Sequence, residues 1–238
     1  MTRWRGIVCL VLFLVAPTFG LSAKPRVRFP LARVDALNLV LGRIQVLRSW
    51  AELGPDFSWM TRFQDPKRVV KVESPNGQSH VWRGRDREGY WLYYQARGHR
   101  AQRLTACHNA YQPVWSPNSR EVAYFAMDWP SHVRGLYVIA PQAGKVSKPR
   151  LEFSADGHLG ASASWSPDGG KIVFDYYGKL WIVNSNGIGR SLLDLSGRMH
   201  QPVLDAQRIA WNKDGSRLAW QTHGESKVTV MDLKRIAY

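Results

Sequence analysis

The chain has 238 residues, enough for one large domain or two small ones, and carries 33 Lys and Arg against 18 Asp and Glu, a formal net charge of +15. Apolar residues make up 45% of the chain and include 11 Trp, 9 Tyr and 8 Phe, which excludes an intrinsically disordered protein. The longest apolar run, Ile7 to Ala16, is ten residues long, well short of the roughly 20 that a spanning helix needs, which excludes a polytopic membrane protein.

The first 23 residues are typical of a signal peptide. Two arginines precede the apolar run, and Pro17 ends it ahead of small residues. We therefore predict that residues 1–23 are a leader, that the rest is exported to the periplasm or secreted, and that no transmembrane segment remains after cleavage. The cleavage site and retention of the leader as an anchor stay open.

Cys9 would leave with the leader, so Cys107 would be the single thiol and no intramolecular disulfide can form.

Residues 24–66 are predicted to form a short N-terminal helix and a linker. Apolar residues recur at intervals of three and four, at Leu31, Val34, Leu37, Leu41, Ile44, Leu47 and Trp50. This spacing indicates an amphipathic helix from Leu31 to Leu53, which the following Gly-Pro pair would end. The competing interpretation is a hairpin that turns at Gly42 and Arg43, in which case the region would be a degenerate repeat of the kind described next.

One motif occurs four times in the rest of the chain. Its fullest copy runs from Trp165 through Ser-Pro-Asp-Gly-Gly-Lys-Ile-Val to Phe174, and further copies begin at Glu73, Trp115 and Trp211. The starts lie 42, 50 and 46 residues apart, which is long enough for four short strands and too long for a leucine-rich or ankyrin repeat. Each copy therefore predicts one sheet.

The residues within a copy are typical of strands joined by tight turns. The Ser-Pro-Asx-Gly segment favours a chain reversal, because Pro presets φ and Gly tolerates positive φ. Nine residues after each start stands an aromatic ring that should pack between adjacent sheets, at Trp82, Tyr124, Phe174 and Trp220. We predict an all-β, propeller-like array of about four four-stranded blades within residues 67–238, near 68–105, 111–153, 161–194 and 207–238.

The motif at Trp165 to Gly169, the strand from Ile172 to Phe174 and the Leu104-Thr105 pair resemble the exported β-propeller repeats of the TolB-like and WD40-like type. The resemblance covers about residues 68 to 238. It implies a place in the bacterial cell envelope and a protein partner such as a peptidoglycan-associated lipoprotein. Asn118-Ser119 and Asn212-Lys213 depart from the pattern, and the first copy places Glu73 where the others have Trp. The chain also has room for four blades, fewer than the six that TolB-like propellers generally have.

The sequence contains none of the common catalytic motifs. It has no Gly-x-Ser-x-Gly motif of a hydrolase nucleophile, no His-Glu-x-x-His motif of a zinc protease, no phosphate-binding Gly-rich loop and no cysteine cluster. Three histidines, His108, His158 and His200, lie in connectors that lead into first strands of blades and would converge on one mouth of the central channel. They are candidates for a divalent-metal site, and propeller lyases of acidic polysaccharides are a distant precedent. The competing interpretation, ordinary loop histidines, is the one we adopt, so we predict no catalytic residue, metal or cofactor.

A stretch between residues 80 and 103 interleaves arginines with aromatic rings. Its candidate binding residues are Arg83, Arg85, Arg87, Tyr90, Trp91, Arg97, Arg100 and Arg103. If the chain is extended there, the first three arginines share one face. Guanidinium groups bind phosphate or carboxylate bidentately, so the pattern favours an anionic partner. The alternative is a solvated blade rim whose charge Asp86 and Glu88 compensate.

These observations together predict an exported cell-envelope binding or scaffolding protein that recognises a protein, an anionic glycan or a lipid through its propeller loops. Nucleic acid is not expected as a partner. The alternative from another class is a metal-dependent propeller enzyme that acts on acidic polysaccharide. Because four blades can form an open arc, a homodimer that completes the ring is a further expectation.

Overall fold

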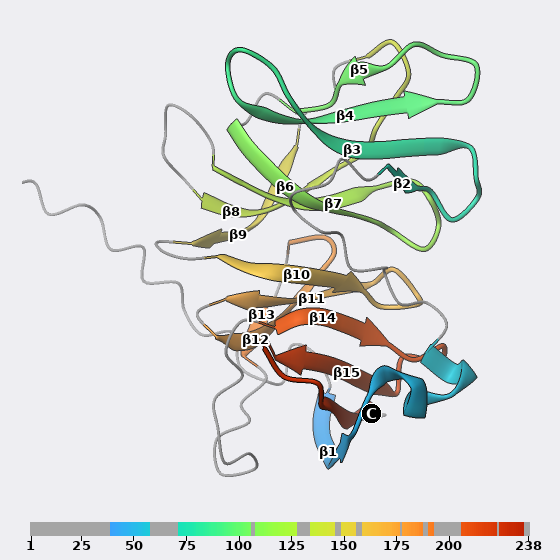
Figure 1. Ribbon diagram of the computed structural model, residues 1–238, viewed down its shortest axis with the longest axis vertical. Coiled ribbons are helices and arrows are strands. Elements are labelled where there is room, and N and C mark those ends of the chain that lie inside the picture. Colours follow the sequence, from blue (N-terminus) through green and yellow to red (C-terminus); the bar gives the residue numbers. More distant parts are fainter. Residues whose placement is uncertain are drawn as a thin grey trace, which may run out of the picture. The chain divides into compact units, whose positions relative to one another are not determined.

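The computed structural model describes residues 39–57, 71–105, 108–127, 134–145, 149–155, 159–176, 178–187, 190–192, 206–222 and 224–235 (Figure 1). These residues form four antiparallel sheets of four strands each. The predicted all-β array of four-stranded blades is therefore confirmed. The predicted leader, residues 1–23, lies outside the described residues. None of the described helices is long and apolar enough to cross a membrane.

We number the sheets as blades 1 to 4 in chain order. Blade 1 contains β2 (Val72–Glu73), β3 (Ser79–Arg85), β4 (Tyr90–Ala96) and β5 (Gln102–Arg103). Blade 2 contains β6 (His108–Trp115), β7 (Val122–Met127), β8 (Arg134–Ile139) and β9 (Arg150–Ala155). Blade 3 contains β10 (Leu159–Trp165), β11 (Lys171–Tyr176), β12 (Lys179–Asn184) and β13 (Arg190–Leu192). Blade 4 contains β14 (Ala206–Trp211), β15 (Arg217–Thr222), β16 (Val228–Arg235) and, at its edge, β1 (Leu39–Leu47).

The amphipathic helix predicted from Leu31 to Leu53 is wrong. Where the structure describes this stretch, it contains β1, paired antiparallel with β16, and two short 3-10 helices, η2 (Trp50–Leu53) and η3 (Pro55–Phe57). The edge of β16 offers unpaired backbone groups, and pairing with them outweighs the weak local preference for helix.

The alternative hairpin at Gly42 and Arg43 is wrong too, because β1 continues through these two residues as a β-bulge. Leu41 pairs with Leu233, and the next paired residue, Ile44, pairs with Met231, so one strand advances by three residues while the other advances by two. The extra residue shifts the alternation of the strand by one position. Such a shift turns a spacing of two into the interval of three between Leu41 and Ile44, one of the intervals that indicated a helix.

Tryptophan indoles join each blade to the one before it. The indole nitrogens of Trp115, Trp165 and Trp211 donate hydrogen bonds of 3.0, 3.1 and 3.4 Å to the carbonyl oxygens of Val72, Val114 and Ser164. Each acceptor stands one residue before the start of the preceding copy of the motif. The motif's first residue is therefore an anchor between blades.

The aromatic rings predicted to lie between sheets do so in three blades. Tyr124, Phe174 and Trp220 are fully buried, and each belongs to the apolar cluster shared with the preceding blade. Trp82, at the same position of blade 1, is only partly buried, because the described chain has no earlier blade to cover it. It stacks on Tyr93, with ring centres 5.8 Å apart.

The far side of blade 4 is covered by the segment that follows β1. Leu53 and Phe57 are buried against Ala210, Ala219 and Val228 of this blade, in the place where a further blade would pack. The backbone oxygen of Asp56 accepts a 2.8 Å hydrogen bond from the amide of Lys213, in the turn between β14 and β15. The 3-10 segment thus caps one end of the array, as terminal units do in repeat proteins.

Candidate functional site

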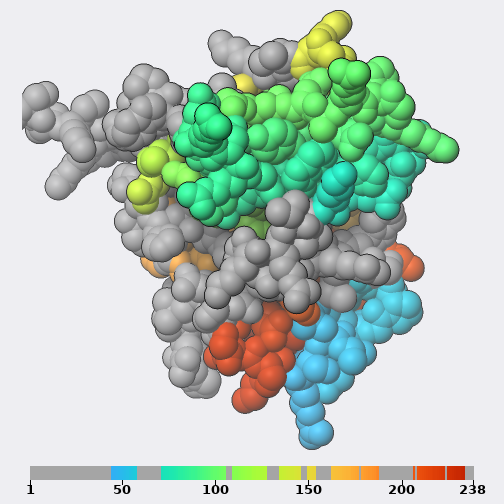
Figure 2. Space-filling model, turned by 45° about the horizontal axis from the view of Figure 1, so that its top comes forward, coloured from blue at the N-terminus to red at the C-terminus, as the bar shows by residue number. Residues whose placement is uncertain are grey.

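The predicted arginine-rich stretch lies entirely in blade 1, whose residues, coloured teal to green, form a continuous exposed surface (Figure 2). Strands β3 and β4 pair over their whole length, from Ser79 opposite Ala96 to Arg85 opposite Tyr90. The hairpin turn at residues 86–89 therefore lies at one end of the blade, and the turn at residues 97–101 lies at the other. Directly paired side chains share a face, so Arg85 and Tyr90 point the same way.

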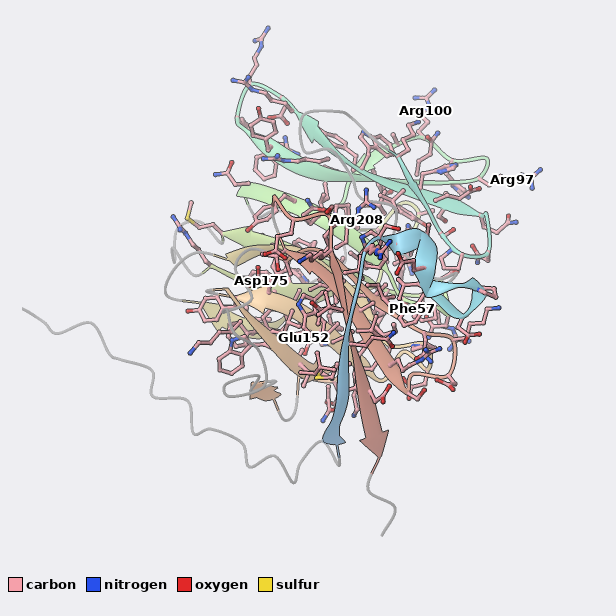
Figure 3. All side chains as sticks on the ribbon, turned by 60° about the horizontal axis from the view of Figure 1, so that its bottom comes forward. Phe57, Arg97, Arg100, Glu152, Asp175 and Arg208 are labelled. Atoms are coloured by element: carbon pink, nitrogen blue, oxygen red, sulfur yellow. The ribbon has the colours of Figure 1, made fainter. Side chains whose placement is uncertain are left out.

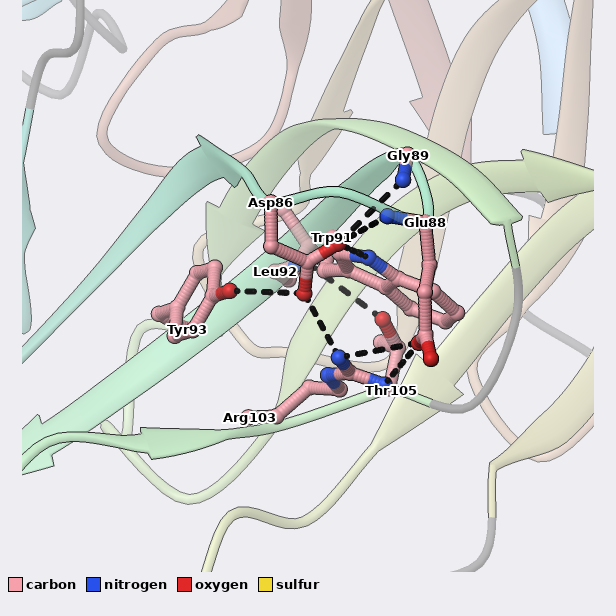
Figure 4. Close-up of polar contacts among 8 residues, drawn as sticks. All are labelled: Asp86, Glu88, Gly89, Trp91, Leu92, Tyr93, Arg103 and Thr105. Atoms are coloured by element: carbon pink, nitrogen blue, oxygen red, sulfur yellow. Dashed lines mark hydrogen bonds and ion pairs between the residues drawn. The ribbon is translucent and has the colours of Figure 1, made fainter.

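Asp86 organises the hairpin turn by accepting five hydrogen bonds (Figure 4). Its Oδ1 accepts from the amides of Glu88 and Gly89, at 2.9 and 3.2 Å, and from the indole nitrogen of Trp91 at 2.8 Å. Its Oδ2 accepts from Nη2 of Arg103 at 2.6 Å and from the hydroxyl of Tyr93 at 3.3 Å. The carboxylate holds the turn and the two neighbouring strands in one geometry.

The charge of Arg103 is paired within this network, with both Asp86 and Glu88. Partial desolvation raises the pKa of Asp86, but hydrogen bonds from the Glu88 amide, the Trp91 indole and Arg103 together lower it to about 2. Arg103 also contacts Oε2 of Glu88 at 3.3 Å, and its guanidinium carbon lies 4.0 Å from the centre of the Trp91 ring. Arg103 and Trp91 therefore have a structural role here, with their charge and ring face used within the hairpin.

Arg83 and Arg85 stand on the other face of the same hairpin, the face that packs toward blade 2. Their guanidinium carbons lie 4.0 and 5.4 Å from the centre of the Tyr90 ring. Nε of Arg83 is buried without a hydrogen-bond partner. Within the described part of the chain neither arginine forms an ion pair, because the adjacent acids are both engaged by Arg103.

The remaining predicted arginines separate into two places. Arg87 is exposed in the turn at residues 86–89, next to Arg85. Arg97 and Arg100 are exposed in the opposite turn, and their side chains point away from the ribbon (Figure 3). The structure thus brings Arg83, Arg85 and Tyr90 together, leaves Arg87 in the adjoining turn and places the other two cations at the far end of β4.

The predicted histidine site falls mostly outside the described residues. His158 and His200 lie outside them, and His108, the first residue of β6, is described by its backbone alone, which pairs with Met127. Among the described residues, no three or more His, Cys, Asp or Glu side chains gather in a group that could hold a metal ion.

Sequence reasoning missed two residues near Arg83 that come from blade 2. Burial raises the pKa of Tyr111 to about 12, while the positive charges of Arg134 and Arg83 act in the opposite direction. Strand β6 is irregular on both sides of Tyr111, with positive φ at Asn109 and Gln112 of 53° and 51°. Arg134 begins β8 and is exposed, so it adds a further cation near Tyr111 and Arg83. Only the packing of adjacent blades could reveal this proximity, since the residues lie far apart in sequence.

Comparison with known proteins supports the fold. The sequence matches no protein-family model and no curated protein. TolB from Acinetobacter baumannii is 15% identical over 71% of this chain and 44% of its own, with a TM-score of 0.48. Hydrazine synthase of Kuenenia stuttgartiensis is 16% identical over 67% and 51%, with a TM-score of 0.52. An oligogalacturonate lyase in complex with manganese is 14% identical over 70% and 48%, with a TM-score of 0.50.

At this level of identity the similarity concerns the fold alone. The four consecutive antiparallel sheets give the described chain a β-propeller-like fold, and TolB and other propellers are among the structures that resemble it. The chain spans about half the length of these solved structures, 44 to 51% of the three compared.

Proposed function

We propose that this protein is a non-catalytic, exported propeller-type binding module that recognises an anionic partner through the hairpin end of blade 1. The contact residues in this proposal are Arg83, Arg85, Arg87 and Tyr90. The partner presents clustered phosphate or carboxylate groups, as an anionic lipid surface or an acidic glycan does.

One observation carries this proposal: both acids of the hairpin are used by Arg103. Asp86 and Glu88 accept hydrogen bonds from the guanidinium of Arg103, at 2.6 and 3.3 Å, on the opposite face of the sheet from Arg83. The sequence alone left open whether these acids neutralise the whole arginine stretch. Their engagement with Arg103 leaves Arg83 and Arg85 without an ion pair among the described residues, and their charge is available to a partner.

The aromatic ring beside these arginines prepares them for binding. The guanidinium of Arg83 lies over the Tyr90 ring, which restricts its motion before an anion binds. Less side-chain entropy is therefore lost on binding. The buried Nε of Arg83 also lacks an acceptor. An anionic oxygen that reaches this guanidinium would supply one, and charge-assisted hydrogen bonds of this kind are about twice as strong as neutral ones.

Export to the cell envelope is part of the proposal and rests on the leader-like residues 1–23. The resemblance to TolB-like repeats makes an acidic envelope protein, such as a peptidoglycan-associated lipoprotein, a further partner to test. Pull-down from envelope extract at low and high salt, with the wild type and the arginine variants described next, would detect it.

The direct test compares two pairs of arginines in the full chain. Binding is measured to phosphatidylglycerol vesicles, phosphatidylcholine vesicles and soluble polygalacturonate. We expect the double variant Arg83→Gln, Arg85→Gln to lose about 10-fold or more in affinity for an anionic probe. The matched control, Arg97→Gln with Arg100→Gln, removes the same charge from the other end of the blade and should lose far less. Equal losses in both variants would refute the site, and binding unchanged in about 0.5 M salt would refute the electrostatic mechanism.

The second candidate function is a metal-dependent enzyme that acts on acidic polysaccharide. It is favoured by the shared fold of the manganese-bound oligogalacturonate lyase and by the three histidine connectors. Replacement of His108 and His158 by alanine distinguishes the two functions. Loss of polysaccharide turnover with retained folding would support the enzyme, and absence of turnover in the wild type supplied with manganese would exclude it.

A further inference from the structure

The outer face of blade 1, which points away from blade 2, has the aromatic pair of an interface between blades. Trp82 and Tyr93 stack with centres 5.8 Å apart and an interplanar angle of 18°. Their counterparts in blade 2, Tyr124 and Tyr137, stack at 5.8 Å and 22°. In blade 2 the pair is buried against blade 1. In blade 1 both rings are partly exposed, although the local geometry is the same.

This face has lost the anchor that would join it to another blade of the same kind. The later copies begin with a Trp whose indole donates to the preceding blade, but blade 1 has Glu73 there, whose side chain is exposed and has no N–H group to donate. Lys71 lies on the same face, with its Nζ 4.7 Å from the centre of the Trp82 ring. The face is thus built for an apolar contact flanked by one acid and one base.

Charge on this face differs from that of the whole chain. Two cations, Lys71 and Arg103, stand beside three acids, Glu73, Asp86 and Glu88, whereas the chain carries +15 overall. Two strongly basic molecules repel one another over most of their surfaces. They can approach most easily where the surface carries no excess of positive charge, as on this face.

The cap on blade 4 restricts how a second copy can meet this face. Head-to-tail packing would need the far side of blade 4, which Leu53 and Phe57 already cover. The remaining arrangement places blade 1 against blade 1 across a two-fold axis, and such an isologous contact closes at two copies. In that arrangement Lys71 of one copy can approach Glu73 of the other.

We propose that the outer face of blade 1 is a homodimer interface, centred on Trp82 and Tyr93 and flanked by Lys71 and Glu73. The dimer is two capped arrays back to back, which differs from a closed ring shared by two copies. The interface is separate from the hairpin face that carries Arg83 and Arg85, so the two proposals stand or fall independently.

Mass measured by light scattering and sedimentation over a range of protein concentrations tests this interface. We expect the wild-type chain to dimerise and Trp82→Ala to weaken dimerisation by about 10-fold or more, because a central aromatic ring dominates such contacts. Leu151→Ala, at an exposed apolar side chain of β9 in blade 2, is the matched control and should leave the dimer intact. A wild type that is monomeric throughout would overturn the proposal.

Charge exchange keeps the test valid if Trp82→Ala unfolds the protein. Lys71→Glu and Glu73→Lys each place like charges across the two-fold axis, and each should weaken the dimer. The double exchange restores the opposite-charge pair and should restore dimerisation. A double variant that dimerises no more tightly than the single variants would contradict the two-fold arrangement. If both single variants and the double variant dimerise as the wild type does, the interface lies elsewhere. Far-UV circular dichroism and thermal melting of each variant serve as the independent check of folding.

Discussion

The indole nitrogen of Trp165 donates a 3.1 Å hydrogen bond to the carbonyl oxygen of Val114, and both atoms are buried between blades 2 and 3. This bond ties the first strand of one blade to the first strand of the blade before it. The same relationship in the neighbouring blades makes the repeat cooperative, since each unit supplies a donor to the previous one and an acceptor to the next.

Replacement of Trp165 by Phe should lower the free energy of unfolding by more than the loss of ring volume alone requires. The buried carbonyl of Val114 would lose its indole donor, which adds a cost of about 1 kcal/mol. The matched control is Trp220→Phe, because the buried indole nitrogen of Trp220 has no partner among the described residues. Urea denaturation measures both. Equal losses would show that the bond to Val114 contributes nothing.

Asp86 is expected to make the stability of the hairpin depend on pH. Its pKa in the folded protein, about 2, lies below the ordinary value of 3.8, so its stabilising contribution is complete above 3.8 and is lost as the pH falls through about 2. Asp86→Asn should therefore lower the Tm at neutral pH and have little effect near pH 2. Glu225→Gln, at an exposed acid in the loop before β16, is the control. A Tm difference for Asp86→Asn that is the same at both pH values would contradict this assignment.

Arg150 is expected to stabilise the protein mainly by neutralising a buried acid. It contacts Glu152 at 3.0 Å and Glu121 at 2.9 Å, and the side chain of Glu152 is 1% exposed. Burial raises the pKa of Glu152, while Arg150 acts to lower it. Arg150→Ala would leave this carboxylate buried and unpaired, at a cost of about 3 kcal/mol.

The double variant Arg150→Ala, Glu152→Gln isolates that effect, because glutamine carries no charge to bury. It should recover a large part of the stability lost in Arg150→Ala, as measured by urea denaturation. Since a raised pKa means that folding favours the protonated acid, Arg150→Ala should also regain stability as the pH falls, relative to the double variant. If Arg150→Ala and the double variant have equal stability at every pH, Arg150 acts through packing and not through the charge of Glu152.

The cap over blade 4 predicts a separate effect on stability and solubility. Phe57 is 1% exposed, and Phe57→Ala should cost about 3 kcal/mol by leaving a cavity against Ala210 and Ala219. It should also expose the end of the array and increase concentration-dependent association. Asp56→Ala, which removes only the exposed ion pair with Arg217, should cost less than about 1 kcal/mol. Similar losses in the two variants would argue against an apolar cap.

Local sequence was sufficient for the repeated part of the fold. The Ser-Pro-Asp-Gly turn at Ser166 reverses the chain through contacts among neighbours: Asp168 accepts from the hydroxyl of Ser166, and Gly169 adopts a φ of 70°. Such devices depend on residues within a few positions, so their spacing reveals the blades. The pairing of β1 with β16 joins opposite ends of the chain, and no local pattern distinguishes it from a helix.

The candidate site could be predicted in composition but not in arrangement. The sequence shows eight basic and aromatic residues in one stretch. Arg83 pairs with Leu92 and Arg103 of β5 pairs with Tyr93, so alternation along β4 sends the two arginines to opposite faces. The sequence also shows two acids without showing which arginine they pair with. That choice depends on the β4–β5 pairing, which brings Arg103 beside Tyr93 and within reach of Asp86.

Hydrogen exchange mapped along the chain with and without anionic vesicles tests the proposed binding site most directly. We predict slower exchange across the paired ends of β3 and β4, around Arg85 and Tyr90, with no change in the turn that contains Arg97 and Arg100. Protection confined to that opposite turn, or spread evenly over all four blades, would contradict a binding site at the hairpin end of blade 1.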